Sequence, residues 1–147
     1  MSSDRKYPII VYTSGTFDLF HVGHLNILEK SKRLGDILIV GVSTDELVES
    51  YKKRRPIITL KDRMRIIQNC KCVDKVIVQR KLTDINDLMK YNVDIITIGD
   101  DWKKKYLEGL EWAKQHGKEV VYFPYTDSVS TTEIKKAIIE GWQENKD

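Results

Sequence analysis

The sequence has few cysteines and histidines, little net charge and no long apolar run, and these shortages exclude several classes of protein. No segment approaches the roughly 20 apolar residues that a membrane-spanning helix needs. The 25 basic and 22 acidic side chains nearly cancel, so the net charge of +3 does not indicate nucleic-acid binding. The N-terminal stretch MSSDRKYPII lacks the hydrophobic region of a signal peptide, and the expected location is therefore cytoplasmic.

The two cysteines, Cys70 and Cys72, are separated by one lysine. Cysteines this close rarely form a structural disulfide, and a zinc site would need further ligands nearby. We therefore expect both thiols to be reduced. The 147 residues, 41% of them hydrophobic, suit one domain over residues 1–147 that is large enough to bury a core.

Short apolar runs rich in β-branched residues alternate with segments of helical spacing. The nearly continuous apolar runs predict buried strands over residues 9–14, 36–43, 75–78, 94–99 and 119–124. The helical spacing predicts helices from 22 to about 34 and over 60–69, 84–91, 104–116 and 130–142. The polar stretch 49–63 is expected to be a mobile loop. This alternation predicts an α/β fold, a Rossmann-like three-layer sandwich around a central parallel sheet of about five strands.

Two of the three histidines, His21 and His24, lie three residues apart where the first strand gives way to a helix. They are open to three interpretations: buried core residues, metal ligands, or donors to an anion. A core role would require buried partners for two rings in one turn. A metal site would need a third ligand, and His116 lies far along the sequence.

The local geometry favours the anion-binding interpretation. A helix that begins near Val22 places both imidazoles in its first turn, beside free N–H groups and the positive end of the helix dipole. Gly15 lets the backbone approach a ligand closely, and Gly23 keeps the surface between the rings low. The carboxyl ends of parallel strands meet at one edge of a sheet, where ligands bind. The sequence therefore predicts a phosphate site at this edge.

Four consecutive cations follow the second predicted strand: Lys52, Lys53, Arg54 and Arg55. Such a run is either a solvated surface or a flexible loop that closes over anionic substrates and excludes water.

A hydroxyl triplet opens the last predicted helix: Ser130, Thr131 and Thr132. These residues are either plain helix caps or a second helix-terminus site for an anion.

The segment GTFDLFHVGH (15–24) resembles the HxGH signature of a nucleotidyltransferase superfamily. That superfamily includes cytidylyltransferases, heptose adenylyltransferases and pantetheine-phosphate adenylyltransferases. GDDW (99–102), STTEIKKAI (130–138) and RMRIIQNCKCVDKVI (63–77) resemble later landmarks of its small CTP-using members. The glycerol-3-phosphate cytidylyltransferases are the most similar group, and the resemblance covers nearly the whole chain.

This resemblance implies that CMP is transferred from CTP to a small phosphorylated alcohol, with release of pyrophosphate. Glycerol 3-phosphate is the first candidate for that alcohol. The acceptor phosphate is already an anion, so catalysis would consist mainly of alignment and charge stabilisation. Mg²⁺ is implied with the triphosphate, held by phosphates and water and not by protein side chains. A homodimer is the expected assembly. The alternatives are an adenylyltransferase that uses ATP and a sugar phosphate, and a non-catalytic nucleotide-binding protein.

The resemblance also assigns roles to individual residues. The catalytic residues it implies are His21, His24, Lys53 and Arg63. The nucleotide-binding residues it implies are Gly15, Thr16, Phe17, Gly23, Lys71, Asp101, Trp102, Tyr125, Thr126, Ser130, Thr131 and Thr132. The acceptor-binding residues it implies are Asp18, Lys52, Arg54 and Arg55. Asp18 is expected to be largely structural, and Trp102 is equally compatible with simple packing.

Three features depart from the family pattern, all on the acceptor side or at the outer end of the nucleotide. YTDSVSTT (125–132) has Tyr125 where the family has arginine and Ser128 where it has glycine. The missing cation would need a substitute from Lys52, Arg54 or Arg55. Lys71 replaces an arginine and loses its planar fork. VQRKLTDIND (78–87) lacks the family tryptophan, so these departures leave the identity of the acceptor undetermined.

Overall fold

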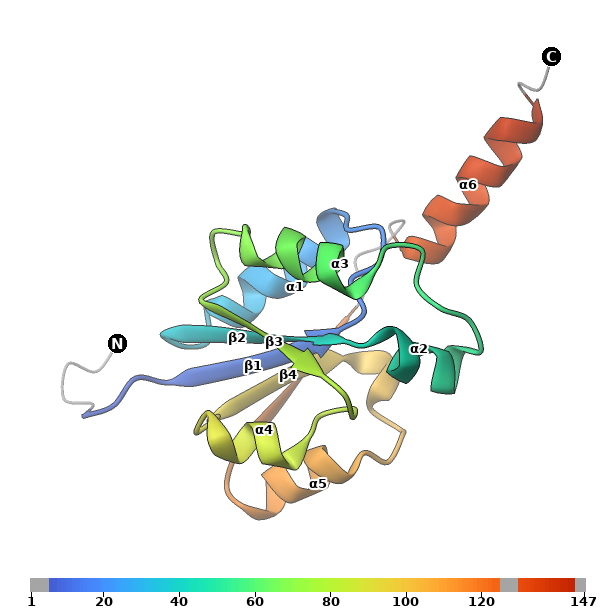
Figure 1. Ribbon diagram of the computed structural model, residues 1–147. Coiled ribbons are helices and arrows are strands. Elements are labelled where there is room, and N and C mark those ends of the chain that lie inside the picture. The colour runs from blue at the N-terminus through green and yellow to red at the C-terminus, as the bar shows by residue number, and fades with distance from the viewer. Residues whose placement is uncertain (1–5, 125–129, 145–147) are drawn as a thin grey trace.

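Strands and helices alternate along the chain in the computed structural model, which describes residues 6–124 and 130–144 (Figure 1). The strands are β1 (Ile10–Gly15), β2 (Ile37–Ser43), β3 (Lys75–Gln79), β4 (Ile95–Gly99) and β5 (Glu119–Phe123). The helices are α1 (Val22–Lys32), α2 (Asp45–Lys52), α3 (Leu60–Gln68), α4 (Ile85–Lys90), α5 (Glu108–Gln115) and α6 (Thr131–Glu144), with a 3₁₀ helix η1 (Asp100–Trp102). None of the helices within the described ranges is long and apolar enough to cross a membrane.

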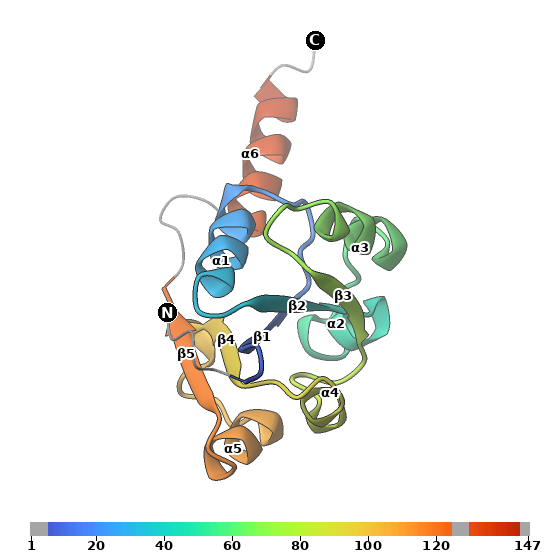
Figure 2. The ribbon, with the colours of Figure 1, turned by 90° about the vertical axis from the view of Figure 1, so that its left-hand side faces the viewer.

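The five strands form one parallel sheet in the order β3-β2-β1-β4-β5, with helices on both faces. Helices α1 and α3 cover one face and α4 and α5 the other (Figure 2). Alternate residues of a strand point to opposite faces, so Val11 packs beneath α1 whereas Tyr12 packs against the α4 and α5 side. The Rossmann-like three-layer fold predicted from the sequence is confirmed.

Helix α2 corrects the prediction of a long mobile loop over 49–63. This helix extends to Lys52 and α3 begins at Leu60, so the loop between them is only 53–59. The Thr44 hydroxyl caps α2 by accepting a hydrogen bond from the Leu47 N–H at 3.0 Å, and Val48 is buried beneath it. The helix predicted from residue 104 begins instead at Glu108, after η1.

At the amino-terminal edge of the sheet an aspartate precedes each of three strands. The carboxylates of Asp36, Asp74 and Asp94 accept from the N–H groups of Ile9, Leu38 and Ile10, at 2.7, 2.7 and 2.9 Å. The N–H groups of these aspartates donate in return to the carbonyls of the same three partners. Each pair of bonds closes a ring that joins two neighbouring strands. The Asp74 carboxylate also accepts from the Lys32 ammonium, so the carboxylates at this edge are engaged within the fold.

Helix α6 extends away from the body of the protein (Figure 1). It is held at its first turns, where the Thr131 hydroxyl donates to the Asp18 carbonyl at 2.9 Å. Lys135 forms an ion pair with the Asp18 carboxylate at 3.7 Å. The start of α6 is thus attached to the loop between β1 and α1.

Candidate active site

A cleft of about 760 Å³ lies at the carboxyl ends of the strands, where the strand order reverses between β1 and β4. The predicted site residues that line it are Gly15, Thr16, Phe17, Asp18, His21, Gly23, His24, Lys52, Arg54, Arg55, Asp101, Trp102, Ser130, Thr131 and Thr132. Lys53, Arg63 and Lys71 do not line it. Tyr125 and Thr126 lie outside the described residues.

The loop from β1 to α1 carries the backbone strain of the site. Phe17 and Leu19 both have positive φ, 55° and 48°, which side chains other than glycine rarely adopt. The Phe17 ring is buried in the core and meets the His24 ring edge-on, with centroids 5.6 Å apart. This buried ring holds the strained loop in the position that begins α1 at Val22.

His21 and His24 form the N-terminal capping box of α1. His21 is the N-cap, and its Nδ1 accepts from the Gly23 N–H at 3.0 Å. The Nδ1 of His24 accepts from the His21 N–H at 3.2 Å. A capping box normally joins Ser or Thr to Glu or Gln, so here two imidazoles take both parts. With each Nδ1 acting as an acceptor, the ring proton of each neutral imidazole must be on Nε2.

The environment keeps both rings neutral. Burial, and then the charge of the neighbouring His21 ring, stacked at a centroid distance of 3.9 Å, lower the pKa of His24 to about 4. Burial also lowers the pKa of His21 below its ordinary value. The Nε2 of His21 is buried and has no hydrogen-bond partner among the described residues. The free protein therefore presents neutral N–H donors to the cleft, one of them buried and unsatisfied.

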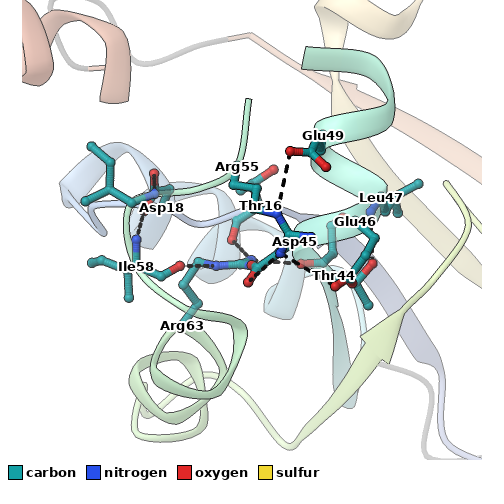
Figure 3. Close-up of polar contacts among 12 residues, drawn as sticks. Thr16, Asp18, Thr44, Asp45, Glu46, Leu47, Glu49, Arg55, Ile58 and Arg63 are labelled. Carbon is teal, nitrogen blue, oxygen red and sulfur yellow. Dashed lines mark hydrogen bonds and ion pairs between the residues drawn. The ribbon is translucent and has the colours of Figure 1, made fainter. Parts of the chain in front are cut away.

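Arg63 lies behind the cleft, completely buried (Figure 3). Its Nε donates to the Ile58 carbonyl at 2.9 Å, and its Nη1 donates to the carbonyls of Thr16 and Ser43, both at 2.8 Å. Its Nη2 is ion-paired with Asp45. The guanidinium thus joins the β1–α1 loop, the end of β2, the start of α2 and the 53–59 loop, and has little capacity left for a substrate.

The cationic run 52–55 presents to the cleft a different lysine, Lys52, from the Lys53 that the resemblance indicated. Lys52 is the last residue of α2 and lines the cleft. Lys53 is the C-cap with φ of 63°, a left-handed turn that directs the chain out of the helix. Burial, together with the charges of Lys135 and Arg54, lowers the pKa of Lys52.

Arg55 lines the cleft but rests on the acidic side of α2. Its guanidinium lies 3.9 Å from Asp45, 3.6 Å from Glu46 and 3.5 Å from Glu49 (Figure 3). Arg55 therefore already has counter-ions on its own segment.

Asp18 anchors the same loop from the opposite side. Its two carboxylate oxygens accept from the Ile57 and Ile58 N–H groups at 2.8 and 2.9 Å, and the side chain is almost completely buried. These bonds support the structural role that the sequence analysis expected for Asp18.

Aromatic side chains from two elements meet at the far end of the cleft. Trp102 of η1 and Tyr51 of α2 are in edge contact, with centroids 6.1 Å apart, and Lys105 lies over the indole at 4.8 Å. The hydroxyls of Tyr51 and Thr16 are 3.5 Å apart. The sequence analysis missed Tyr51, because its position on α2 was assigned to a loop.

A buried polar network supports the wall formed by the β3–α4 loop. Gln79 accepts from the Tyr12 hydroxyl at 2.7 Å and from the Thr83 N–H at 3.1 Å, and donates to the Ser43 hydroxyl at 3.1 Å. Gln79 and Thr83 both line the cleft, and Thr83 has φ of 48°. A Cβ atom at Gly109 would lie only 1.8 Å from the Thr83 carbonyl oxygen, so α5 supports this wall from behind. The sequence analysis missed these residues, although Gln79 stands out as a polar residue that ends an apolar strand.

Two further predictions concern residues away from the cleft. Lys71 is exposed and precedes β3, at the amino-terminal edge of the sheet, opposite the cleft. Cys70 and Cys72 are free thiols, and burial raises the pKa of both. The described residues contain no group of three or more His, Cys, Asp or Glu side chains that could hold a metal ion.

The fold and the site together define a Rossmann-like α/β protein with a cleft at the switch point of its sheet, lined by paired histidines and by cations. A family model described as cytidylyltransferase-like matches residues 12–137. The chain therefore belongs to the cytidylyltransferase-like family of nucleotidyltransferases.

Individual relatives agree with this assignment. The chain is 43% identical over 127 residues to a glycerol-3-phosphate cytidylyltransferase of Bacillus spizizenii, covering 86% of this chain and 94% of the relative. It is 38% identical over 136 residues to the bifunctional protein HldE of Helicobacter hepaticus, covering 92% of this chain but 27% of that protein. The crystal structure of a lipopolysaccharide core biosynthesis protein from Thermoplasma volcanium superimposes with a TM-score of 0.66 at 30% identity, covering 82% of this chain and 98% of that one.

Proposed function

We propose that the protein transfers CMP from CTP to a small phosphorylated alcohol, with glycerol 3-phosphate as the first candidate, and releases pyrophosphate. The observation that carries the proposal is the capping box, in which both Nδ1 atoms serve the helix. This arrangement leaves neutral Nε2–H donors at the positive end of α1, beside the cleft. The similarity over 94% of a glycerol-3-phosphate cytidylyltransferase supports the choice of substrates.

In this reaction an oxygen of the acceptor phosphate bonds to the α-phosphorus, and the bond from that phosphorus to the bridging oxygen of the β-phosphate breaks. No protein nucleophile and no proton transfer are required. The Nε2–H groups of His21 and His24 would donate to the α- and β-phosphate oxygens as negative charge accumulates in the transition state. Removal of one such donor typically costs about 100- to 1,000-fold in rate.

The remaining cleft residues divide by their position. The hydroxyls and N–H groups at the start of α6 suit the outer phosphates, although Ser130 also caps the helix through the Glu133 N–H at 3.0 Å. Asp101 and Trp102 suit the nucleoside. Lys52 is placed to contact the triphosphate, whereas a role for Lys53 would require movement of the 53–59 loop.

Arg63 would act as a positioning residue. It donates to the Thr16 carbonyl, and Thr16 follows β1 directly at the cleft. It also holds the start of α2 through Asp45. Its contribution to the reaction would be the position of these two segments.

Mg²⁺ would arrive with the triphosphate and neutralise part of its charge. Magnesium in such sites is usually held by one or two carboxylates together with phosphates and water. Asp101 is a carboxylate on the cleft lining that would be available to such an ion.

The second candidate is an adenylyltransferase that uses ATP and a sugar phosphate. The feature that favours it is Tyr125, because the adenylyltransferases of the superfamily also tend to lack the arginine at this position. We further expect a homodimer, which light scattering of the purified protein would test directly.

The decisive experiment measures pyrophosphate release from CTP and ATP in the presence of glycerol 3-phosphate, other polyol phosphates and sugar phosphates. We expect release with CTP and a polyol phosphate. Release with ATP and a sugar phosphate alone would replace the proposal with the second candidate. Binding of CTP without turnover of any acceptor would indicate a nucleotide-binding protein that is not an enzyme.

A further inference from the structure

Tyr51 is a cleft residue to which neither the sequence motifs nor the family resemblance assigns a role. It lies in the last turn of α2, one position before Lys52, and is half-buried. The two ends of its side chain meet different parts of the cleft. The ring is in edge contact with Trp102, at a centroid distance of 6.1 Å, and the hydroxyl approaches that of Thr16. Tyr51 thus connects η1 with the residue that follows β1.

The hydroxyls of Tyr51 and Thr16 do not satisfy each other. Their oxygens are 3.5 Å apart, whereas an O–H···O hydrogen bond is usually about 2.5–3.0 Å long. Each hydroxyl has one proton to donate, and an oxygen of a ligand placed between them can accept from both at ordinary distances. The pair therefore forms a two-donor site for one oxygen of an anion.

One buried cation fixes both segments that carry these hydroxyls. The Nη1 of Arg63 donates to the Thr16 carbonyl at 2.8 Å, and its Nη2 is ion-paired with Asp45 in the first turn of α2 (Figure 3). The Thr44 cap and the buried Val48 hold the same helix. The spacing of the two hydroxyls is thus set before a ligand arrives, and donors that are already in place stabilise a transition state most effectively.

We propose that Tyr51 is a catalytic residue whose hydroxyl, together with that of Thr16, donates to an oxygen of the α-phosphate. This inference deepens the proposed function and rests on it. In that function Trp102 contacts the nucleoside, and the loop from β1 to α1 leads to the groups that hold the phosphates. The α-phosphate joins these two parts of the nucleotide. A side chain that contacts Trp102 and also reaches Thr16 therefore lies beside it.

The two hydroxyls would act on charge and would transfer no proton. An oxygen of the acceptor phosphate bonds to the α-phosphorus, and the bond from that phosphorus to the bridging oxygen of the β-phosphate breaks, its electron pair leaving on pyrophosphate. While both bonds are partial, negative charge is spread over the other oxygens of the α-phosphate. Donors to one of these oxygens then stabilise the transition state more than the ground state. Tyr51 should therefore affect kcat more than the affinity for CTP.

The test separates the hydroxyl of Tyr51 from its ring. Tyr51→Phe removes only the hydroxyl and keeps the contact with Trp102, whereas Tyr51→Leu removes both. Tyr7→Phe is the matched control, because Tyr7 is exposed, precedes β1 at the amino-terminal edge of the sheet and does not line the cleft. Pyrophosphate release from CTP and glycerol 3-phosphate gives kcat. Calorimetry without acceptor gives the affinities for CTP, CMP and cytidine.

We expect Y51F to lower kcat about 10- to 100-fold and to weaken CTP and CMP binding only about 2- to 5-fold. The affinity for cytidine and the melting temperature should not change. Y51L should in addition weaken cytidine binding, because Trp102 loses its aromatic neighbour. Thr16→Val should lower kcat to a similar extent, and the losses of T16V and Y51F should not add in the double variant, because both hydroxyls serve one oxygen. Y7F should match the wild type throughout.

Four results would overturn the inference. Unchanged kcat in Y51F would remove the hydroxyl from the reaction, and additive losses in the double variant would show that the two hydroxyls act separately. A loss with CTP that is absent with 2′-deoxy-CTP would place the Tyr51 hydroxyl at the ribose. Equal weakening of CMP and cytidine would reduce Tyr51 to a support for Trp102. If the wild-type protein binds CTP but turns over no acceptor, the proposed function fails, and the affinities for CMP and cytidine still decide where the hydroxyl lies.

Discussion

The two edges of the sheet use polar side chains in opposite ways. At the amino-terminal edge, Asp36, Asp74 and Asp94 each exchange two hydrogen bonds with a neighbouring strand. At the carboxyl edge, the Nε2 of His21 is buried without a partner among the described residues, and the Lys135 ammonium lies 3.7 Å from the Asp18 carboxylate. One edge satisfies its polar groups within the sheet. The other holds, within the described part of the chain, a buried donor that has no protein partner.

The difference separates stability from chemistry within one fold. Satisfied groups at the amino edge join strands, and their loss should cost stability and leave turnover intact. Unsatisfied groups at the carboxyl edge contribute little to stability, because no bond is formed there in the free protein. The capping box combines both types of group, since each imidazole has one nitrogen bonded to the helix and the other free for the cleft.

The largest expected effect comes from replacing His21 or His24 with asparagine. The Asn side chain places an acceptor close to the position of Nδ1 and is a favoured cap, so α1 should keep its start. The Nε2 donor is lost. We expect turnover to fall about 100- to 1,000-fold while the melting temperature changes little. Steady-state pyrophosphate release and thermal unfolding measure the two quantities.

Glutamine at the same positions provides the reverse comparison. Its longer side chain reaches the position of Nε2 and gives up the bond to the helix. The Gln variants should retain more turnover than the Asn variants and lose more stability. Equal turnover in both series would show that the free nitrogens do not carry the catalysis.

The second effect is the pH dependence of stability. The pKa of His24 is about 4 in the folded chain and near 6.5 when unfolded, so the unfolded state binds more protons between these values. The free energy of unfolding should therefore fall as the pH drops from 6.5 towards 4, by about 2 kcal/mol for this incompletely buried ring. Urea unfolding of wild type and H24N at several pH values isolates the contribution of His24. If the free energy of unfolding depends on pH in the same way in both proteins, His24 makes no such contribution.

The smallest expected effect lies at the opposite edge. Asp94→Ala removes the acceptor of the Ile10 N–H between β1 and β4. We expect a loss of about 1–2 kcal/mol in the free energy of unfolding and turnover within twofold of wild type. Asp94→Asn keeps an acceptor oxygen and should recover part of the loss. If fully folded D94A lost much of its turnover, the amino-terminal edge of the sheet would affect the chemistry at the carboxyl edge.

The elements that the sequence predicts well are those with a strong local signal. The strands follow from continuous apolar runs such as 36–43, and the start of α1 follows from the glycines and the paired histidines. Helix α2 was missed because charged residues dominate it, although Thr44 followed by Asp45 and Glu46 is a recognisable helix start.

The site residues were harder to predict, because their roles depend on helical phase and on distant segments. Lys52 and Lys53 are adjacent in sequence. Lys52 ends α2 and lines the cleft, whereas Lys53 is the left-handed C-cap and does not. Arg63 matches a family arginine in sequence, but its burial depends on carbonyls of three separate segments that fold around it. Lys135 lacks a local signal, since its cleft position depends on how α6 meets Asp18.

Gly109 offers a way to alter the shape of the cleft indirectly. It never touches the cleft, yet even one methyl group there would push the Thr83 carbonyl, and with it the wall of the β3–α4 loop, toward the substrates. Evolution or engineering can therefore reshape the cleft through a residue of α5 while the residues that line it stay the same.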